Sequence, residues 1–469
     1  MTAIPKTPTG IQGLDQILKG GVPTGRTTLI CGGPGSGKTI LALEFLYHGA
    51  SNGEPGVFLG FEEDADAIRR NAAAMDRDLE LLERAGKLIV CVPRVAPTAV
   101  LSGEFDLKGL LAIVDGQARA IGAKRIVVDS LDVLLRVFDN ARRERNELVA
   151  LNDWLLERGF TSVLTLKDEQ IAARYDFLEY LADCVVRLDR RVQGQVTTRR
   201  LRVAKCRGSG FASNEYPYVI EERGVLLLPI TRMILAPPSA EALLPSGNTV
   251  IDELLGGGYR SGSSILISGR TGAGKTTLAM TFVRSATQRG ERVLYISFEE
   301  AERNITYGAS NVGIDLQPAT QSGKFLVHAV LPESMGAEEH LSEALKLIDR
   351  HQPAHVFVDS ISACTRMGSE QAAFDYVMRM ICACKEHGRT IFLINQLTGA
   401  SHETITGMGV SSLIDTVIQL DLREDGTDSL LTRTFLVAKS RGVHHSLRRH
   451  RFCITDSGIR LEPTAGGAQ

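Results

Sequence analysis

Short apolar runs alternate along the chain with stretches whose apolar positions recur at helical spacing. The runs occupy residues 27–33, 56–63, 87–92, 125–130, 161–167 and 184–189 in the first half, and 264–269, 292–300, 325–330, 355–360, 390–396 and 416–421 in the second. Such runs are typical of strands buried on both faces. The alternation therefore predicts an α/β fold with a mainly parallel sheet, helices on both faces and the ligand at the carboxyl ends of the strands.

The second half of the chain repeats the first. The segments TGIQGLDQILKGGVPTGRTTLI and SGNTVIDELLGGGYRSGSSILI correspond, and Asp15 matches Asp252 at an offset of 237 residues, as Lys38 matches Lys275. Two unrelated domains would not keep this register. The boundary falls in the proline-bearing stretch that begins at Ile230. We predict a first domain at residues 1–232, a linker at 233–244 and a second domain at 245–469.

Composition narrows the class of protein. Of the 469 residues 43% are hydrophobic and 23% charged, as in ordinary globular proteins, and the net charge of -2 provides no basic field for nucleic acid. No run is long enough to span a bilayer, and the first residues lack the apolar core of a signal peptide, so we expect a cytoplasmic protein. The eight cysteines are scattered without a CxxC pair, which predicts neither zinc nor a disulfide framework.

Each half carries a phosphate-binding loop. GGPGSGKT and GRTGAGKT both fit G-x-x-x-x-G-K-[ST], and each stands between a predicted strand and a helical stretch. In such a loop the backbone N–H groups surround a phosphate, the lysine reaches the β- and γ-phosphates of ATP, and the last hydroxyl ligates Mg²⁺. A chance glycine-rich loop is the alternative, but two copies in this context argue against it. The predicted ATP-binding residues are Gly33, Gly35, Ser36, Gly37, Lys38, Thr39, Gly272, Ala273, Gly274, Lys275 and Thr276.

Paired glutamates end the second strand of each half, 24 residues after the loop lysine: Glu62 with Glu63, and Glu299 with Glu300. A carboxylate at this edge can orient and deprotonate an attacking oxygen, so all four are candidate catalytic residues. A solvated strand end is the alternative. Neighbouring residues on a strand face opposite sides, so the members of a pair should differ in role, but their spacing does not identify the base.

Two further motifs recur. Asp129 and Asp359 end apolar strands, and we predict that they hold Mg²⁺ together with the loop hydroxyls of Thr39 and Thr276, the alternative being a helix cap. A K-x-R-G motif follows a late strand in each half. It indicates phosphate contact from a neighbouring subunit, the alternative being solvated hairpin charges. Its basic residues are Lys205, Arg207, Lys439 and Arg441.

Taken together, these residues resemble the KaiC family, RecA-superfamily ATPases and autokinases of circadian clocks and their relatives. The resemblance covers nearly the whole chain and includes KCRGSGFASNEYPYVI and KSRGVHHSLRRHRFCITDSGIRL. It implies two tandem RecA-like P-loop domains, and a homohexameric double ring with ATP and Mg²⁺ at the subunit interfaces. It also implies that the K-x-R-G side chains contact nucleotide in trans, and that a KaiB-like or other signalling partner exists.

The resemblance assigns different work to the two halves. It implies that the first mainly hydrolyses ATP with Glu62 activating water. It implies that the second phosphorylates itself with Glu299 as base, on two adjacent hydroxyls in ITGMGVSSLIDTVIQL. These are Ser411 and Ser412, and Thr406 matches a threonine that can take part. The chain departs from clock members in its glycine-rich 407–409 and in its end, EPTAGGAQ, where they carry a longer tail that recruits KaiA, so we do not expect KaiA binding.

Two other functions compete with an autokinase that signals through its phosphorylation state. A RecA- or DnaB-like motor would move nucleic acid, but the net charge and the lack of a basic aromatic patch argue against nucleic-acid binding. A non-catalytic scaffold would only bind ATP. The intact glutamates and aspartates of both halves argue against the scaffold.

Overall fold

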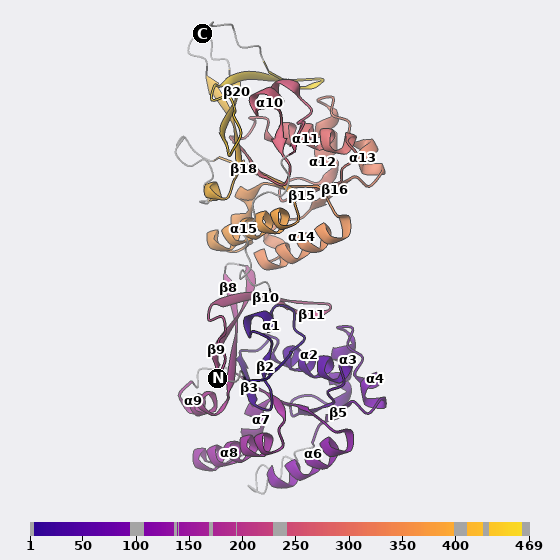
Figure 1. Ribbon diagram of the computed structural model, residues 1–469, viewed down its shortest axis with the longest axis vertical. Coiled ribbons are helices and arrows are strands. Elements are labelled where there is room, and N and C mark those ends of the chain that lie inside the picture. Colours follow the sequence, from indigo (N-terminus) through magenta and orange to yellow (C-terminus); the bar gives the residue numbers. More distant parts are fainter. Residues whose placement is uncertain are drawn as a thin grey trace. The chain divides into compact units, whose positions relative to one another are not determined.

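A computed structural model describes residues 4–93, 107–135, 138, 140–167, 172–193, 195–227, 242–397, 410–424 and 431–461. The chain forms two compact units, each built on one nine-stranded sheet (Figure 1). We call the elements from β1 to β11 domain 1 and those from β12 to β22 domain 2. A two-stranded sheet precedes each P-loop strand: β1 (Lys6–Thr7) with β2 (Val22–Pro23), and β12 (Leu243–Leu244) with β13 (Tyr259–Arg260).

The sheet of domain 1 runs in the order β11-β10-β9-β8-β3-β7-β6-β4-β5. Its strands are β3 (Thr27–Gly32), β4 (Gly56–Gly60), β5 (Leu88–Cys91), β6 (Arg125–Asp129), β7 (Thr161–Lys167), β8 (Cys184–Gln193), β9 (Val196–Cys206), β10 (Glu215–Glu221) and β11 (Gly224–Leu227). The strands from β8 to β5 are parallel, and β9, β10 and β11 add an antiparallel extension. The parallel part brings the ends of β3, β4 and β6 to one edge.

Domain 2 has the same strand order. Starting from the edge strand that corresponds to β5, it runs β16-β15-β17-β18-β14-β19-β20-β21-β22. The strands are β14 (Ser264–Gly269), β15 (Val293–Ser297), β16 (Phe325–Ala329), β17 (His355–Asp359), β18 (Thr390–Gln396), β19 (Thr416–Glu424), β20 (Leu431–Ser440), β21 (His450–Thr455) and β22 (Gly458–Leu461). The prediction of two α/β domains with mainly parallel sheets is confirmed.

Helices cover both faces of each sheet (Figure 1). Domain 1 has α1 (Leu14–Ile17), α2 (Lys38–Ser51), α3 (Ala65–Ala73), α4 (Leu79–Arg84), α6 (Leu107–Ile121), α7 (Leu131–Leu135), α8 (Ala141–Glu157) and α9 (Ala172–Leu181). Domain 2 has α10 (Thr249–Leu254), α11 (Lys275–Gln288), α12 (Glu302–Ser310), α13 (Gln317–Gln321), α14 (Ala337–His351), α15 (Glu370–Glu386) and the 3₁₀ turns η1 (Pro332–Ser334), η2 (Ile361–Met367) and η3 (Val410–Ser412). In domain 1, α2 packs into one apolar cluster and α6 with α8 into another, which buries the sheet on both sides.

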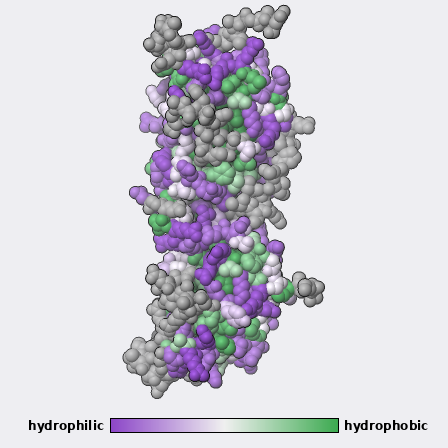
Figure 2. Space-filling view, turned by 90° about the vertical axis from the view of Figure 1, so that its left-hand side faces the viewer, coloured by the Kyte–Doolittle hydropathy of each residue, from purple (hydrophilic) through white to green (hydrophobic). Residues whose placement is uncertain are grey.

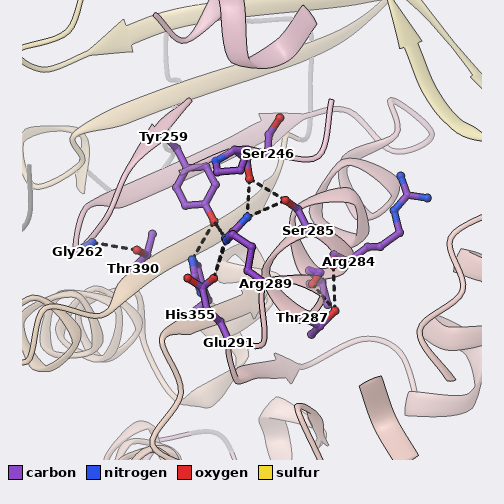
Figure 3. A network of polar contacts seen from close by, with 12 residues as sticks. Ser246, Tyr259, Gly262, Arg284, Ser285, Thr287, Arg289, Glu291, His355 and Thr390 are labelled. Carbon is purple, nitrogen blue, oxygen red and sulfur yellow. Dashed lines mark hydrogen bonds and ion pairs between the residues drawn. The ribbon is translucent and has the colours of Figure 1, made fainter. Parts of the chain in front are cut away.

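A polar network in domain 2 connects the end of α11 with the start of β17 (Figure 3). Arg289 donates hydrogen bonds to the Tyr259 hydroxyl at 2.8 Å and the Glu291 carboxylate at 2.7 Å. The same hydroxyl bonds His355 Nε2 at 2.9 Å. Burial lowers the pKa of His355 to about 3, so the imidazole is neutral. The network lies at the first residue of β17, the opposite end from Asp359, and serves packing.

The surface of the described residues carries both hydrophilic and apolar side chains. On the face drawn in Figure 2, hydrophilic residues cover much of the surface, and apolar residues stand in patches between them. No helix among the described residues combines the length and the apolar character that crossing a membrane requires.

Candidate functional site

In domain 1 the lysine of the P-loop is hydrogen-bonded to the backbone of its own loop. The loop runs from the end of β3 to Lys38, the first residue of α2. Gly37 has φ 88°, a left-handed conformation that favours glycine, and a Cβ there would lie 2.8 Å from Ile220 Cδ1. Lys38 Nζ donates to the carbonyl oxygens of Gly32 at 2.8 Å and Gly33 at 3.1 Å. Burial lowers the pKa of Lys38, which Asp129 opposes. The ammonium is thus held where phosphate oxygens can replace the carbonyls.

The P-loop of domain 2 has the same form. Gly274 precedes α11 with φ 95°, and Lys275 Nζ donates to Arg270 O at 3.0 Å. Two residues that the sequence patterns missed also bind this loop. Arg433 Nε donates to Gly272 O at 3.2 Å, and Gln396 Nε2 donates to Thr271 Oγ1 at 2.7 Å. The loop is therefore braced from β20 and from the end of β18.

The predicted metal residues come together in both domains. In domain 1 the buried carboxylate of Asp129 accepts hydrogen bonds from Thr165 and from Thr39, and burial raises its pKa. In domain 2, Thr276 Oγ1 lies 3.5 Å from Asp359 Oδ2. A hydroxyl and a carboxylate beside a P-loop are the hard oxygen donors that suit Mg²⁺, which keeps several waters and needs few protein ligands. The residues present therefore fit ATP with Mg²⁺.

Asp359 takes its support from a different strand than Asp129. The Tyr295 hydroxyl, on β15, donates to Asp359 Oδ2, and burial raises the pKa of Asp359 to about 6. The partner of Asp129 is Thr165, which comes from β7 on the other side of β6. Phe58 stands at the position of Tyr295 in domain 1, 237 residues earlier. The two domains therefore hold the same carboxylate from opposite neighbours.

The glutamates of the first pair have separate partners. Ser130, the residue after Asp129, donates from Oγ to Glu62 Oε1 at 2.7 Å. Asn71 of α3 donates to Glu63 Oε2 at 2.8 Å. Both glutamates are exposed. Glu62 thus lies at the edge that carries Asp129, whereas Glu63 is tied to the outer helix.

The second pair is arranged differently. Glu299 and Glu300 line an open hollow with residues 329–331, and Glu300 N–H donates to Ser297 Oγ at 3.0 Å. Ser360, the counterpart of Ser130, caps η2 by accepting from Ala363 N–H at 3.3 Å. The serine after the strand-ending aspartate thus bonds a glutamate in domain 1 and a helix end in domain 2.

A pair of charged residues in domain 1 is replaced by neutral ones in domain 2. Lys167 lies opposite the P-loop glycine Gly32 in the β3–β7 register, and its N–H donates to Asp132 Oδ1 at 3.3 Å. In domain 2, Gln396 stands at the position of Lys167 and Ser362 at that of Asp132. The N–H of Gln396 donates to Ser362 Oγ at 3.3 Å. No motif marks these positions, but aligning TSVLTLK with TIFLINQ would have revealed the exchange.

The K-x-R-G side chains of domain 1 bind the end of α9. Lys205 Nζ donates to the carbonyl oxygens of Glu179 at 2.6 Å, Tyr180 at 3.0 Å and Ala182 at 2.7 Å. Arg207 donates to Tyr180 O at 2.8 Å. Cations at the carboxyl end of a helix satisfy its last carbonyl groups. The motif therefore fixes the segment that leads into β8.

Domain 2 uses the same contacts on another segment. Lys439 Nζ donates to Ile414 O at 2.6 Å, and Arg441 donates to Ser412 O at 3.3 Å. Ser412 is exposed in η3, which also contains Ser411. The side chain of Ser411 and all of Thr406 lie outside the described residues. The motif of domain 2 thus holds the backbone of the predicted phosphorylation segment.

Neither K-x-R-G motif can reach the P-loop of its own domain. Cys184 starts β8 opposite Thr28, near the start of β3, and the N–H of Arg207 donates to Asp183 O at 2.8 Å. The motif therefore lies at the amino end of β3, whereas the P-loop leaves its carboxyl end. At about 3.3 Å per residue, the six-residue strand separates them by roughly 15 Å. A contact with nucleotide needs a second subunit.

Comparison with known proteins agrees with this duplicated architecture. The KaiC ATPase family matches residues 7–232 and again 244–466. "Circadian clock protein KaiC2" of Synechocystis sp. (strain ATCC 27184 / PCC 6803 / Kazusa) is 38% identical over 97% of this chain and 81% of its own length. "Circadian clock oscillator protein KaiC" of Parathermosynechococcus lividus is 34% identical over 100% of this chain and 87% of its own. The chain therefore belongs to the KaiC family and is a tandem ATPase.

Proposed function

We propose that this protein hydrolyses ATP in both domains and phosphorylates itself on Ser411 and Ser412, so that its phosphorylation state carries a signal. The observation that supports this most is the pair of bonds from Arg207 to Tyr180 O and from Arg441 to Ser412 O. They identify Ser412 as the counterpart of Tyr180, and Ser411 as that of Glu179. Only domain 2 has adjacent aliphatic hydroxyls there.

The position of the basic motifs supports assembly into a ring. Because Lys439 and Arg441 lie at the opposite end of the sheet from their own P-loop, they can meet a nucleotide only on a neighbouring subunit. The exposed Ser412 shares that edge, so a neighbour's γ-phosphate would face it. We infer a homohexameric double ring with ATP between subunits and a KaiB-like or other signalling partner, as the resemblance to the KaiC family implies.

The chain's own residues divide the chemistry. The P-loop amides with Lys38 and Lys275 would bind the phosphates, and Thr39 with Asp129, or Thr276 with Asp359, would hold Mg²⁺. Bound Mg²⁺ would neutralise negative charge on the phosphates. Glu62 orients and deprotonates water in domain 1, because it lies at the Asp129 edge. Glu299 deprotonates a serine hydroxyl of the adjoining subunit in domain 2.

The test is phosphate transfer from ATP labelled on its γ-phosphate. The double variant Ser411→Ala and Ser412→Ala should lose incorporation and keep ATP hydrolysis. Ser457→Ala, at another exposed serine of domain 2, is the control and should incorporate label like the unaltered chain. Label that persists on the double variant would reject the assignment of the acceptor.

A further inference from the structure

Two buried cysteines face each other in domain 1. Cys184 begins β8, Cys206 ends β9, and their side chains are hydrogen-bonded. The bond from Arg207 N–H to Asp183 O, 2.8 Å, joins the residue after one cysteine to the residue before the other. In an antiparallel ladder, this makes the cysteines a non-hydrogen-bonded pair, with Cα atoms about 4.5 Å apart. That separation lies within the range that a disulfide spans.

A lysine prepares one sulfur of this pair for reaction. Lys6 Nζ, on β1, donates to Cys206 Sγ at 3.3 Å. The Cys184 thiol and then the Lys6 ammonium hold the pKa of Cys206 below the usual range for a thiol, while the same contact raises the pKa of Cys184. Cys206 keeps 6% of its surface exposed. A thiolate beside a cation is the form of cysteine that reacts as a nucleophile.

Domain 2 shows that the fold does not need this pair. Thr416 and Ser440 occupy the same register in β19 and β20, with their hydroxyl oxygens 3.5 Å apart. The corresponding bond from Arg441 N–H to Asp415 O is also 2.8 Å. Leu243 stands 237 residues after Lys6, at the same place in the small sheet. The two cysteines and Lys6 therefore occur together in domain 1, although the same fold forms in domain 2 without them.

We propose that Cys184 and Cys206 form a reversible disulfide when the protein meets a peroxide. The Cys206 thiolate attacks one oxygen of hydrogen peroxide, the O–O bond breaks, and hydroxide leaves, which gives a sulfenic acid. The Cys184 sulfur then attacks the Cys206 sulfur. The S–S bond forms as hydroxide leaves and takes the Cys184 proton. Two thiols and one peroxide become one disulfide and two waters, and a dithiol reverses the change.

The position of the proposed disulfide predicts an effect on ATP hydrolysis. Cys206 stands between Lys205 and Arg207, whose side chains hold the end of α9. A covalent tie at Cys206 fixes the strand that carries both cations. We expect the oxidised protein to hydrolyse ATP more slowly and to recover with dithiothreitol. This consequence rests on the proposed trans role of the motif, whereas formation of the bond does not.

The test uses the full-length protein, hydrogen peroxide and thiol alkylation before peptide mass mapping without reductant. We expect a linked pair of peptides containing Cys184 and Cys206 that dithiothreitol separates. Oxidation of the exposed Cys453 alone, or intact Cys184 and Cys206 at peroxide concentrations that oxidise Cys453, would overturn the proposal. So would a Cys206 that stops at sulfinic acid. Cys453→Ser is the matched control and should leave the linked peptides unchanged.

The repeat supplies variants that match residues already accepted by the fold. Cys184→Thr with Cys206→Ser copies domain 2 and should make hydrolysis indifferent to peroxide. At a pH near or below 6, Lys6→Leu should slow formation of the linked peptides, because loss of the ammonium raises the pKa of Cys206 from about 6 and leaves less thiolate. Equal rates with and without Lys6 would show that its ammonium does not promote the reaction of Cys206. Unchanged hydrolysis in a fully linked protein would reject the consequence and leave the disulfide standing.

Discussion

The guanidinium of Arg441 donates a hydrogen bond to the carbonyl oxygen of Ser412 at 3.3 Å. Arg207 makes the corresponding bond to Tyr180 at 2.8 Å in domain 1. One arginine position therefore holds the segment before β8 or β19 in each domain, but only in domain 2 does that segment carry adjacent serines. The two domains therefore differ in the residues that the shared arginine contact holds.

Arg441→Ala should reduce self-phosphorylation by about tenfold or more, because it removes both the anchor of the acceptor segment and a cation that a neighbour's nucleotide would meet. Arg207→Ala should reduce ATP hydrolysis by domain 1 and leave the acceptor segment in place. Label incorporation and hydrolysis are measured on both variants. Equal losses of incorporation in the two would contradict a special role for Arg441.

Glu62→Gln should lower ATP turnover by domain 1 about 100-fold, since Glu62 lies at the Asp129 edge through its bond with Ser130. Glu63→Gln should change turnover little, because Glu63 bonds Asn71 of α3. Turnover is measured in chains whose second P-loop carries Lys275→Ala. A larger loss from Glu63→Gln would reverse the assignment.

Tyr295→Phe should raise the Mg²⁺ concentration needed for half-maximal nucleotide binding in domain 2 by about tenfold, because outer partners fix the carboxylate that serves the metal. Domain 1 already has phenylalanine at that position, so the core should accept it. Tyr376→Phe is the control. Tyr376 is also buried, and its hydroxyl has no hydrogen-bond partner among the described residues. Equal shifts in both variants would show a packing effect only.

His355 should make domain 2 less stable as the pH drops below about 6.5 towards 3, whereas Asp359, whose pKa burial raises to about 6, acts in the opposite direction. Burial lowers the pKa of His355 to about 3, so over that range the unfolded chain binds a proton that the folded domain excludes. This contribution amounts to at most about 1.4 kcal/mol per pH unit. Hydrogen exchange of peptides from β17 measures it as the difference between the unaltered chain and His355→Gln, and that difference should shrink as the pH falls. Domain 1 is an internal reference, because Arg125, bonded to Glu54 at 2.5 Å, begins its equivalent strand. The same slope in both proteins would assign the whole pH dependence to other groups.

The fold and the outline of the site could be predicted because their signals are local. Apolar runs, P-loop glycines and strand-ending carboxylates keep their spacing within one strand or loop, and the repeat doubles each signal. The support of Asp129 and Asp359 could not be predicted. It comes from Thr165 and Tyr295, which the sheet order places beside them from distant parts of the chain.

The roles of the basic motifs and of two cysteines also needed the structure. Lys205 binds carbonyl groups, which every residue carries, so no side-chain pattern marks its partners. Cys184 and Cys206 are 22 residues apart without a metal-binding spacing, and only the antiparallel register of β8 and β9 brings them together. The sequence supported apolar packing for them, whereas the structure shows that Cys206 also accepts a hydrogen bond from Lys6.

Intact-mass spectrometry after incubation with ATP and Mg²⁺ tests the central claim most directly. We predict species that carry one and two added phosphoryl groups. We also predict that the Ser411→Ala and Ser412→Ala double variant and the Lys275→Ala variant keep the unmodified mass. An unaltered chain that hydrolyses ATP and yet keeps a single unmodified mass would contradict the proposal that this protein phosphorylates itself.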